Sequence, residues 1–153
     1  YEYTLAGESE LHPTFPVTHI SFYEADAFAR WSGARLATEF EWEHVAKQAV
    51  NEVELTTTPF FHPRAAAGNG VQQLLDECWQ WTMSSYAPYP GFRPLSGTLG
   101  EYNGKFMANQ MVLRGGSCVS PEGHVRNTYR NFFYAKDRWQ FTGIRLVRNG
   151  AKL

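Results

Sequence analysis

Residues 21–46, SFYEADAFARWSGARLATEFEWEHVA, contain the clearest folding signals in this chain of 153 residues. Ser21 and Glu24 form a capping box, in which the hydroxyl accepts from the backbone N–H of Glu24 and the carboxylate reaches back to Ser21. Thr38 and Glu41 repeat the same motif further along. Apolar residues recur at helical spacing after each box. We therefore predict two short helices joined by a tight loop.

The remainder of the chain indicates loops followed by short strands. Residues 51–75 contain prolines and a Gly-Asn-Gly turn without a regular period, and residues 93–110 are rich in glycine, so we expect loops in both. Runs of β-branched and aromatic residues predict strands within residues 111–114, 125–133 and 143–148. Helices first and strands later are typical of an α+β domain.

Composition excludes several classes of function. The 14 basic and 15 acidic residues give a net charge of -1, which argues against a nucleic-acid-binding tail or a polybasic membrane patch. No apolar run is long enough to predict a membrane helix, and no signal peptide opens the chain. Cys78 and Cys118 lack a C-x-x-C pattern, so we expect buried or half-buried thiols and a cytoplasmic location. Because the chain begins at Tyr1 and its first methionine is Met83, we interpret it as one piece of a longer protein.

Few residues indicate chemistry when taken alone. The five histidines form no H-x-x-x-H or H-E-x-x-H pattern, so we assign no metal ligands to this chain. Glu39, Glu41 and Glu43 alternate within a predicted helix, and we interpret them as solvated charges near its start. Gly115-Gly116 favours close backbone approach over a turn that carries a nucleophile. Aromatic residues make up 16% of the chain, and their clusters predict a pocket wall for a cationic or flat ligand.

Five stretches together resemble the formylglycine-generating-enzyme-like domain, a variant of the C-type lectin fold. They are PVTHISFYEA (16–25), RLATEFEWE (35–43), WQWT (79–82), LRGGS (113–117) and GIRL (143–146). The resemblance covers nearly the whole chain and implies one domain over residues 1–153. It also implies an α+β fold with two short N-terminal helices, short antiparallel strands and much irregular loop.

Further stretches resemble the ergothioneine-biosynthesis sulfoxide synthases, the EgtB family. They are YPGF (89–92), EYNGKFM (101–107) and YRNFF (129–133) with RWQFTG (138–143). Enzymes of this family use iron(II) and O2 to join a cysteine thiol to C2 of the imidazole ring of hercynine, as a sulfoxide. Their iron ligands are histidines of an upstream DinB-like helical domain, in a pattern that this chain lacks. The resemblance implies a substrate-pocket domain that packs against the iron-binding domain and is inactive alone.

Departures from these families affect the expected substrate. Formylglycine-generating enzymes need a cysteine pair, and the corresponding residues here are Ser120 and Val125, which disfavours that activity. Sulfoxide synthases that use γ-glutamylcysteine carry Trp-Asp and a later Arg, where this chain has Phe132-Phe133 and Asp137. Because a carboxylate cannot pair with the glutamyl carboxylate of that substrate, we expect free cysteine as the thiol substrate.

The same resemblance supplies the candidate site residues. Tyr102, Phe132 and Phe133 are expected to wall the hercynine pocket, with the phenylalanine rings facing the trimethylammonium group. Further candidates for substrate binding are Trp81, Asn103 and Arg138. No catalytic residue is assigned to this chain. Three arginines are interpreted as long side chains that bridge loops: Arg126, Arg130 and Arg145.

Alternative hypotheses stay open at this point. One is a non-enzymatic lectin-like ligand-binding domain, and another is a 5-histidylcysteine sulfoxide synthase of the ovothiol pathway, which would use histidine. A free ammonium group would need a carboxylate partner, whereas a trimethylammonium group suits aromatic walls, so Phe132 and Phe133 favour hercynine. Glu and Asn side chains in the loops would permit a structural calcium ion, although no spacing requires one.

Overall fold

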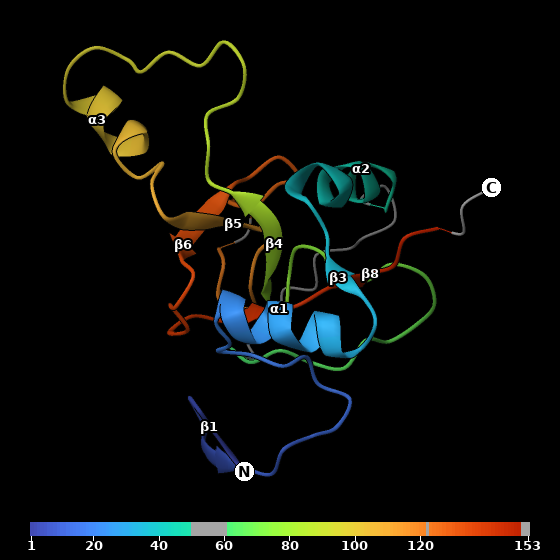
Figure 1. Ribbon diagram of the computed structural model, residues 1–153. Coiled ribbons are helices and arrows are strands. Elements are labelled where there is room, and N and C mark those ends of the chain that lie inside the picture. Colours follow the sequence, from blue (N-terminus) through green and yellow to red (C-terminus); the bar gives the residue numbers. More distant parts are fainter. Residues whose placement is uncertain (50–60, 122, 151–153) are drawn as a thin grey trace.

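The centre of the domain is a four-stranded sheet with the order β6-β5-β4-β7. The computed structural model describes residues 1–49, 61–121 and 123–150 (Figure 1). The strands of the sheet are β4 (Trp79–Ser85), β5 (Gln110–Arg114), β6 (Asn131–Tyr134) and β7 (Thr142–Gly143). β5 is antiparallel to both β4 and β6, as predicted, whereas β7 is parallel to β4. The prediction of antiparallel strands is therefore wrong for β7.

Two helices form where the capping boxes predict them, α1 (Phe22–Trp31) and α2 (Glu39–Ala49). The backbone N–H of Ser21 donates to the Glu24 carboxylate at 2.8 Å, and the N–H of Glu24 donates back to the Ser21 hydroxyl at 3.3 Å. Thr38 and Glu41 make the same two bonds at 2.8 and 3.2 Å. Both predicted boxes are confirmed, because each satisfies backbone donors that a helix start leaves without partners.

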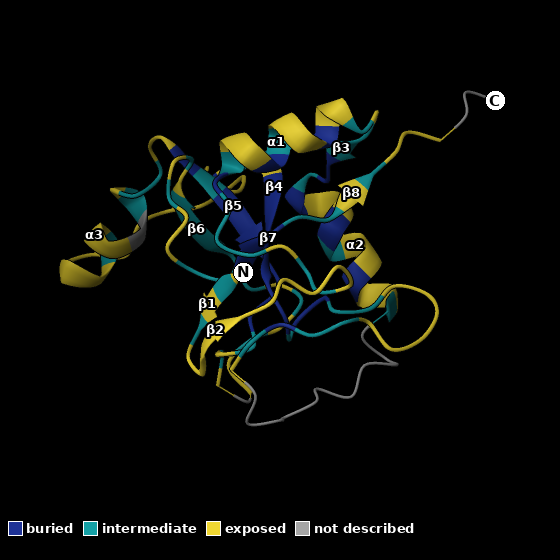
Figure 2. Ribbon diagram, turned by 90° about the horizontal axis from the view of Figure 1, so that it is seen from below, coloured by how far each residue is buried: buried dark blue, intermediate teal, exposed yellow. Residues whose placement is uncertain are grey.

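The helices cover the sheet through small or flat side chains. Ala25 and Ala29 of α1 are fully buried in a cluster with Trp81 and Leu113, and α1 lies across the sheet in Figure 1. α2 buries Trp42, Ala46 and Glu39, and a second apolar cluster forms against it. Figure 2 shows that β4 and β5 are buried in the interior of the domain, whereas the outer faces of α1 and α2 are exposed.

Two smaller strand pairs complete the domain. β1 (Glu2–Thr4) pairs antiparallel with β2 (Gly7–Ser9), and β3 (Arg35–Leu36) pairs antiparallel with β8 (Leu146–Val147). The second pair ties the loop between the helices to the C-terminal region. Within the described residues, no helix combines the length and the apolar character needed to cross a membrane.

Three of the predicted element boundaries need correction. The strand expected over 125–133 begins only at Asn131, because a turn precedes it in which the N–H of Tyr129 donates to the carbonyl of Arg126 at 2.9 Å. The strand expected over 143–148 is divided between two partners, β4 and β3. The loop expected over 93–110 contains a short helix, α3 (Thr98–Gly104), which projects from the body in Figure 1.

Residues 50–60 of the expected 51–75 loop lie outside the described residues. From residue 61 to residue 75 the chain has neither helix nor strand, as predicted.

Candidate functional site

Four aromatic rings form a continuous column on one side of the sheet. The Tyr86 and Phe132 rings are stacked, with centroids 4.0 Å apart and planes 10° apart. Phe106 lies 5.8 Å from Phe132 and 5.7 Å from Tyr102. The column therefore runs from Tyr86, which is 7% exposed just beyond β4, to Tyr102 of α3, which is 64% exposed. We call Tyr86, Phe132, Phe106 and Tyr102 the aromatic column.

An ion pair between the half-buried Arg130 and the buried Glu39 lies at the inner end of the column. The Nε and Nη2 atoms of Arg130 donate to the two carboxylate oxygens of Glu39 at 2.8 and 2.9 Å. The Arg130 guanidinium carbon lies 4.8 Å from the Tyr86 ring centroid and 4.2 Å from that of Tyr89. The Tyr89 hydroxyl also donates to Glu39 at 2.9 Å. A planar cation is thus held between two aromatic faces, with its edge on a carboxylate.

Both tyrosines beside Arg130 remain neutral at physiological pH. Burial raises the pKa of the Tyr86 phenol above its ordinary value. Burial, and then donation to the Glu39 carboxylate, raise the pKa of Tyr89. These phenols therefore offer uncharged ring faces, which attract cations through their π electrons.

The three glutamates of α2 are not equally solvated, which corrects the sequence interpretation. Glu39 is 3% exposed and neutralised by Arg130, and Glu43 contacts the fully buried Arg114 and also Lys47. Only Glu41, paired with Arg35 at 2.7 Å, fits the predicted surface charge. Acidic side chains alternating along a helix point in different directions, so each meets a different part of the fold.

The structure brings Phe132 and Tyr102 into one cluster, joined through Phe106. Phe133 is directed to the opposite face of β6, because successive strand residues alternate. There it packs against the core beneath α1 and lies 5.1 Å from the Trp139 ring. Phe133 therefore does not lie beside Phe132 and Tyr102, as the expected pocket would require.

Trp81 and Arg138, two of the remaining candidates, also lie away from the aromatic column. Trp81 is 1% exposed in the core, and its Nε1 donates to the carbonyl of Ile20 at 2.8 Å. Arg138 is paired with Glu24 of α1 at 3.1 Å. Asn103 lies on α3, and its side chain is outside the described part of the chain.

Sequence reasoning did not assign Tyr86, Glu39 or Arg130 to this site. Arg130 is a bridge, as predicted, because its guanidinium connects Glu39 of α2 to the carbonyl of Ala87 at 3.1 Å. Arg145 bridges in the same way, because it donates to Gln80 and to the carbonyls of Gln72 and Gln73. Tyr86 directly follows the tryptophan-containing strand β4, so the sequence alone could have placed it at the end of a strand. Its contact with Phe132 depends on strand pairing.

Neither cysteine thiol is activated as a nucleophile. Both cysteines are free thiols, with Cys78 buried and Cys118 half-buried, as predicted. Burial raises the pKa of Cys118 to about 12 and also raises that of Cys78, so both stay protonated and weakly nucleophilic. Across the described ranges, no group of three or more His, Cys, Asp or Glu side chains is placed to hold a metal ion.

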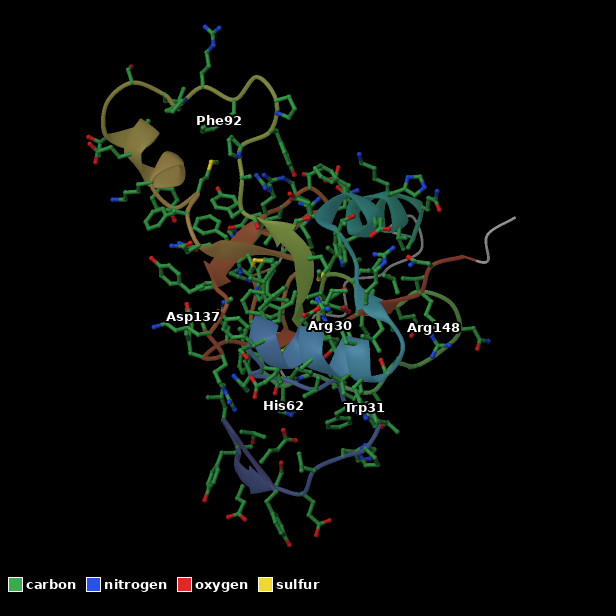
Figure 3. The ribbon with its side chains drawn as sticks, in the orientation of Figure 1. Arg30, Trp31, His62, Phe92, Asp137 and Arg148 are labelled. Carbon is green, nitrogen blue, oxygen red and sulfur yellow. The ribbon has the colours of Figure 1, made fainter. Side chains whose placement is uncertain are left out.

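A separate cavity of about 540 Å³ lies between the N-terminal segment and the body. Its lining includes His12, His19 and His62, and His62 is 3.3 Å from the Glu2 carboxylate. Figure 3 shows His62 on the side of the body that faces β1, far from the projecting segment that carries Phe92.

Comparison with known proteins identifies the family. The model of the sulfatase-modifying factor enzyme 1-like domain matches residues 5–67 and 50–150. The chain belongs to this family, which confirms the expected formylglycine-generating-enzyme-like domain and its α+β class.

The similar curated proteins include hercynine oxygenases and a formylglycine-generating enzyme. The chain is 31% identical over 158 residues to the hercynine oxygenase of Mycolicibacterium smegmatis, covering 86% of this chain and 37% of that protein. It is 32% identical over 156 residues to the hercynine oxygenase of Mycobacterium tuberculosis, covering 86% and 36%. It is 29% identical over 151 residues to the formylglycine-generating enzyme of Streptomyces coelicolor, covering 77% and 46%. The chain thus spans less than half the length of these relatives.

Proposed function

We propose that this chain is the substrate-pocket domain of an iron(II)- and O2-dependent sulfoxide synthase that acts on hercynine in ergothioneine biosynthesis. The observation that carries this proposal is the aromatic column. Hercynine bears a trimethylammonium group, and aromatic faces are the usual protein partners of quaternary ammonium ions. The relatives named hercynine oxygenase support the same substrate.

The chain's own part in the reaction is to bind and orient substrate. Its described residues contain no fitting set of metal ligands, so we assign the iron to an upstream helical domain. The phenylalanine and tyrosine rings would hold the trimethylammonium group and exclude water around it. That fixes the position of the imidazole ring relative to the iron, and fixed geometry is a major source of rate enhancement.

The projecting segment between β4 and β5 suits a contact with that helical domain. Its exposed apolar side chains are Tyr89, Phe92, Leu95, Leu99 and Tyr102. Figure 3 shows Phe92 on this segment, away from the sheet. Such a concentration of exposed apolar groups is typical of a surface that another element covers.

We propose free cysteine as the thiol substrate. Asp137 lies in the turn after β6, where its N–H donates to the carbonyl of Tyr134 at 2.9 Å. Figure 3 shows Asp137 at the edge of the body beside β6. A carboxylate there would repel the glutamyl carboxylate of γ-glutamylcysteine, a group that free cysteine lacks.

The test uses the full-length protein that contains this chain, purified with iron(II). We expect hercynine, O2 and cysteine to give the sulfoxide product, measured by mass spectrometry. Product with γ-glutamylcysteine alone would keep the family assignment and reject the cysteine proposal. No product from folded, iron-loaded protein with either thiol would favour histidine as the acceptor, or a domain that only binds ligands.

A pair of variants tests the pocket directly. Phe132→Leu keeps an apolar side chain but removes the aromatic face, so we expect the KM for hercynine to rise about tenfold. Phe28→Leu is the matched control, because Phe28 is an exposed ring on α1 that contacts Trp31. An unchanged KM in Phe132→Leu would contradict the proposed pocket.

A further inference from the structure

We propose that a smaller cavity near the start of β4 binds a small monovalent anion, a halide ion or a small carboxylate, on the guanidinium of Arg145. The site is separate from the aromatic column, because Gln80 near one end of β4 lines the cavity and Tyr86 lies just beyond the other end. At the rise of an extended strand, these two positions are about 20 Å apart. The inference does not depend on the proposed function.

The cavity has a volume of about 160 Å³ and lies where three segments meet. Pro16 and Val17 of the N-terminal segment form one wall. β4 and β7 form another, where Gln80 pairs with Gly143, and Arg145 follows β7. The volume is several times what a single water molecule requires, so a halide ion or a formate-sized carboxylate fits.

The Arg145 side chain is held by neutral partners and keeps one nitrogen for a ligand. Its Nε donates to Oε1 of Gln80 at 2.8 Å, and its Nη2 donates to the carbonyls of Gln72 and Gln73 at 2.6 and 3.3 Å. Among the described residues, none accepts a hydrogen bond from Nη1, and this atom retains accessible surface. Because Arg145 lines the cavity, the two donors of Nη1 can bind an anion there.

Gln80 fixes the orientation of Arg145, because the bonds of its own amide group are saturated. Its Oε1 also accepts from Nε1 of Trp42 at 2.7 Å, and its Nε2 donates to the carbonyls of Gln73 and Leu74 at 3.0 and 3.1 Å. Gln80 is 3% exposed, so water does not compete for these bonds. The guanidinium is therefore preorganised and does not rearrange to meet a ligand.

The charges around the cavity favour an anion. Glu77 lies in the lining, but its carboxylate is paired with Arg64, accepting from the backbone N–H at 2.7 Å and lying 3.4 Å from Nη2. Asp76 precedes it and does not line the cavity. Arg145 has no such carboxylate, and burial lowers the pKa of its guanidinium, as expected for a cation that has lost hydration without gaining a negative partner. The uncompensated charge in the lining is therefore positive.

The apolar part of the lining limits the kind of anion. Pro16, Val17 and Ile144 offer no side-chain donors, so they cannot replace the hydration of a doubly charged ion such as sulfate. A monovalent anion loses less hydration on entering. Once bound, it would join the N-terminal segment, β4 and the C-terminal region, and would stabilise the folded state.

Anomalous scattering can locate the anion directly. Crystals of the full-length protein that contains this chain are grown with sodium bromide and measured at the bromine absorption edge. We expect a bromine peak inside the cavity, in contact with Nη1 of Arg145. Water at that position without a bromine peak would overturn the proposal.

A titration in solution tests binding at moderate concentration and distinguishes the two sources of anion. The melting temperature is followed against bromide or formate, with the ionic strength held constant by gluconate, which is too large to enter. We expect a saturable rise with at least one of the two small anions. Saturation with bromide alone would assign a free halide, and stronger binding of formate would assign a carboxylate. A rise that does not saturate with either anion would be a general salt effect and would reject the site.

Arg145→Met removes the cation and should abolish the saturable rise. The matched control is Arg148→Met, which removes the same charge from an exposed side chain directly after β8, at the edge of the body in Figure 3. Where Arg145→Met does not fold, Arg145→Lys is the deciding variant. A single ammonium group cannot bond Gln80 and the two carbonyls and also hold the anion, so the dissociation constant should rise at least about tenfold. Equal titrations in Arg145→Lys and Arg148→Met would overturn the proposal.

Discussion

Individual glycines determine how closely the turn after β5 approaches the segment before β4. A Cβ at Gly115 would lie 2.4 Å from the carbonyl oxygen of Leu74, and one at Gly116 would lie 2.2 Å from that of Leu75. Real Cβ atoms do not approach backbone this closely. The prediction that this pair permits close backbone approach is confirmed, and the alternative of a nucleophile turn has no support in the raised pKa of Cys118.

Gly116→Ala should therefore destabilise the domain strongly, by about 3 kcal/mol, since the added methyl group meets the Leu75 backbone and the Val125 side chain, and the backbone must move. Gly33→Ala is the matched control. Gly33 has φ +67 with nothing within 4 Å of the added Cβ, so it should cost only about 1 kcal/mol for the left-handed conformation. Urea unfolding of each variant measures the free energy of unfolding. An equal or smaller loss in Gly116→Ala would show that the contact is relieved easily.

Side-chain direction explains why two adjacent candidate residues of the pocket lie apart in the structure. Phe132 and Phe133 are adjacent in the sequence, yet one stacks on Tyr86 and the other packs beneath α1 near Trp139. Alternation along β6 forces this outcome. A resemblance between sequences assigns a role to a residue by its position in a motif, and this does not specify which face of a strand the side chain occupies.

At the scale of elements, α2 is joined to the sheet largely through polar and charged side chains. Its first turn places Glu39 in the interior with Arg130 and Glu41 on the surface with Arg35. Further along, Glu43 contacts Arg114 of β5. The helix thus joins the sheet through charged side chains as well as through Trp42, which donates from Nε1 to Gln80 at 2.7 Å.

The exposed Glu41–Arg35 pair at the start of α2 should make the free energy of unfolding depend on pH. Hydrogen bonds from the Arg35 guanidinium, followed by that from the N–H of Thr38, lower the pKa of Glu41 from 4.5 to about 2. A carboxylate whose folded pKa is lowered stabilises the fold above its unfolded pKa and loses that contribution as the pH falls toward the folded value. The stabilisation from Glu41 should therefore be lost between pH 4.5 and about 2.

Melting temperatures of wild type and Glu41→Gln from pH 6 to pH 2 check this expectation. The wild type should lose its advantage over the variant across that acid range. The expected size is below about 1 kcal/mol, because the pair is exposed to solvent. Parallel curves for the two proteins would contradict it.

At the scale of the whole molecule, segments far apart in the sequence meet at the candidate site. Glu39 comes from α2, Tyr86 follows β4, Phe106 follows α3, and Phe132 belongs to β6. The β4, β5 and β6 pairings bring the last three together. The aromatic residues are therefore divided among a buried core, the aromatic column and exposed positions elsewhere on the domain, such as Trp31 and Trp139.

Fluorescence quenching tests this division for the five tryptophans. Trp42, Trp79 and Trp81 are 3, 7 and 1% exposed, whereas Trp31 and Trp139 are 81 and 68% exposed. Figure 3 shows Trp31 at the end of α1, pointing away from the sheet. We expect acrylamide to quench two classes of emission, and the accessible class to disappear in Trp31→Phe combined with Trp139→Phe. A single class in the wild type would contradict the described packing.

The sequence by itself determined the features that depend on local chemistry. Capping boxes at Ser21 and Thr38 set where α1 and α2 begin, and Gly115-Gly116 marked a close backbone approach, because each signal involves neighbouring residues only. The same residues, taken as motifs, determined the family. Two predicted helices followed by predicted strands indicated the α+β class, which is confirmed, although the structure also has β1 and β2 before α1 and β3 between the helices.

Only the tertiary structure decided the aromatic column and the Glu39–Arg130 pair at its inner end. Their members lie up to 93 positions apart, from Glu39 to Phe132. Which of them meet depends on strand register, on the face that each side chain occupies, and on the burial of a helix start. These are properties of long-range packing, and residue spacing along the chain does not specify them.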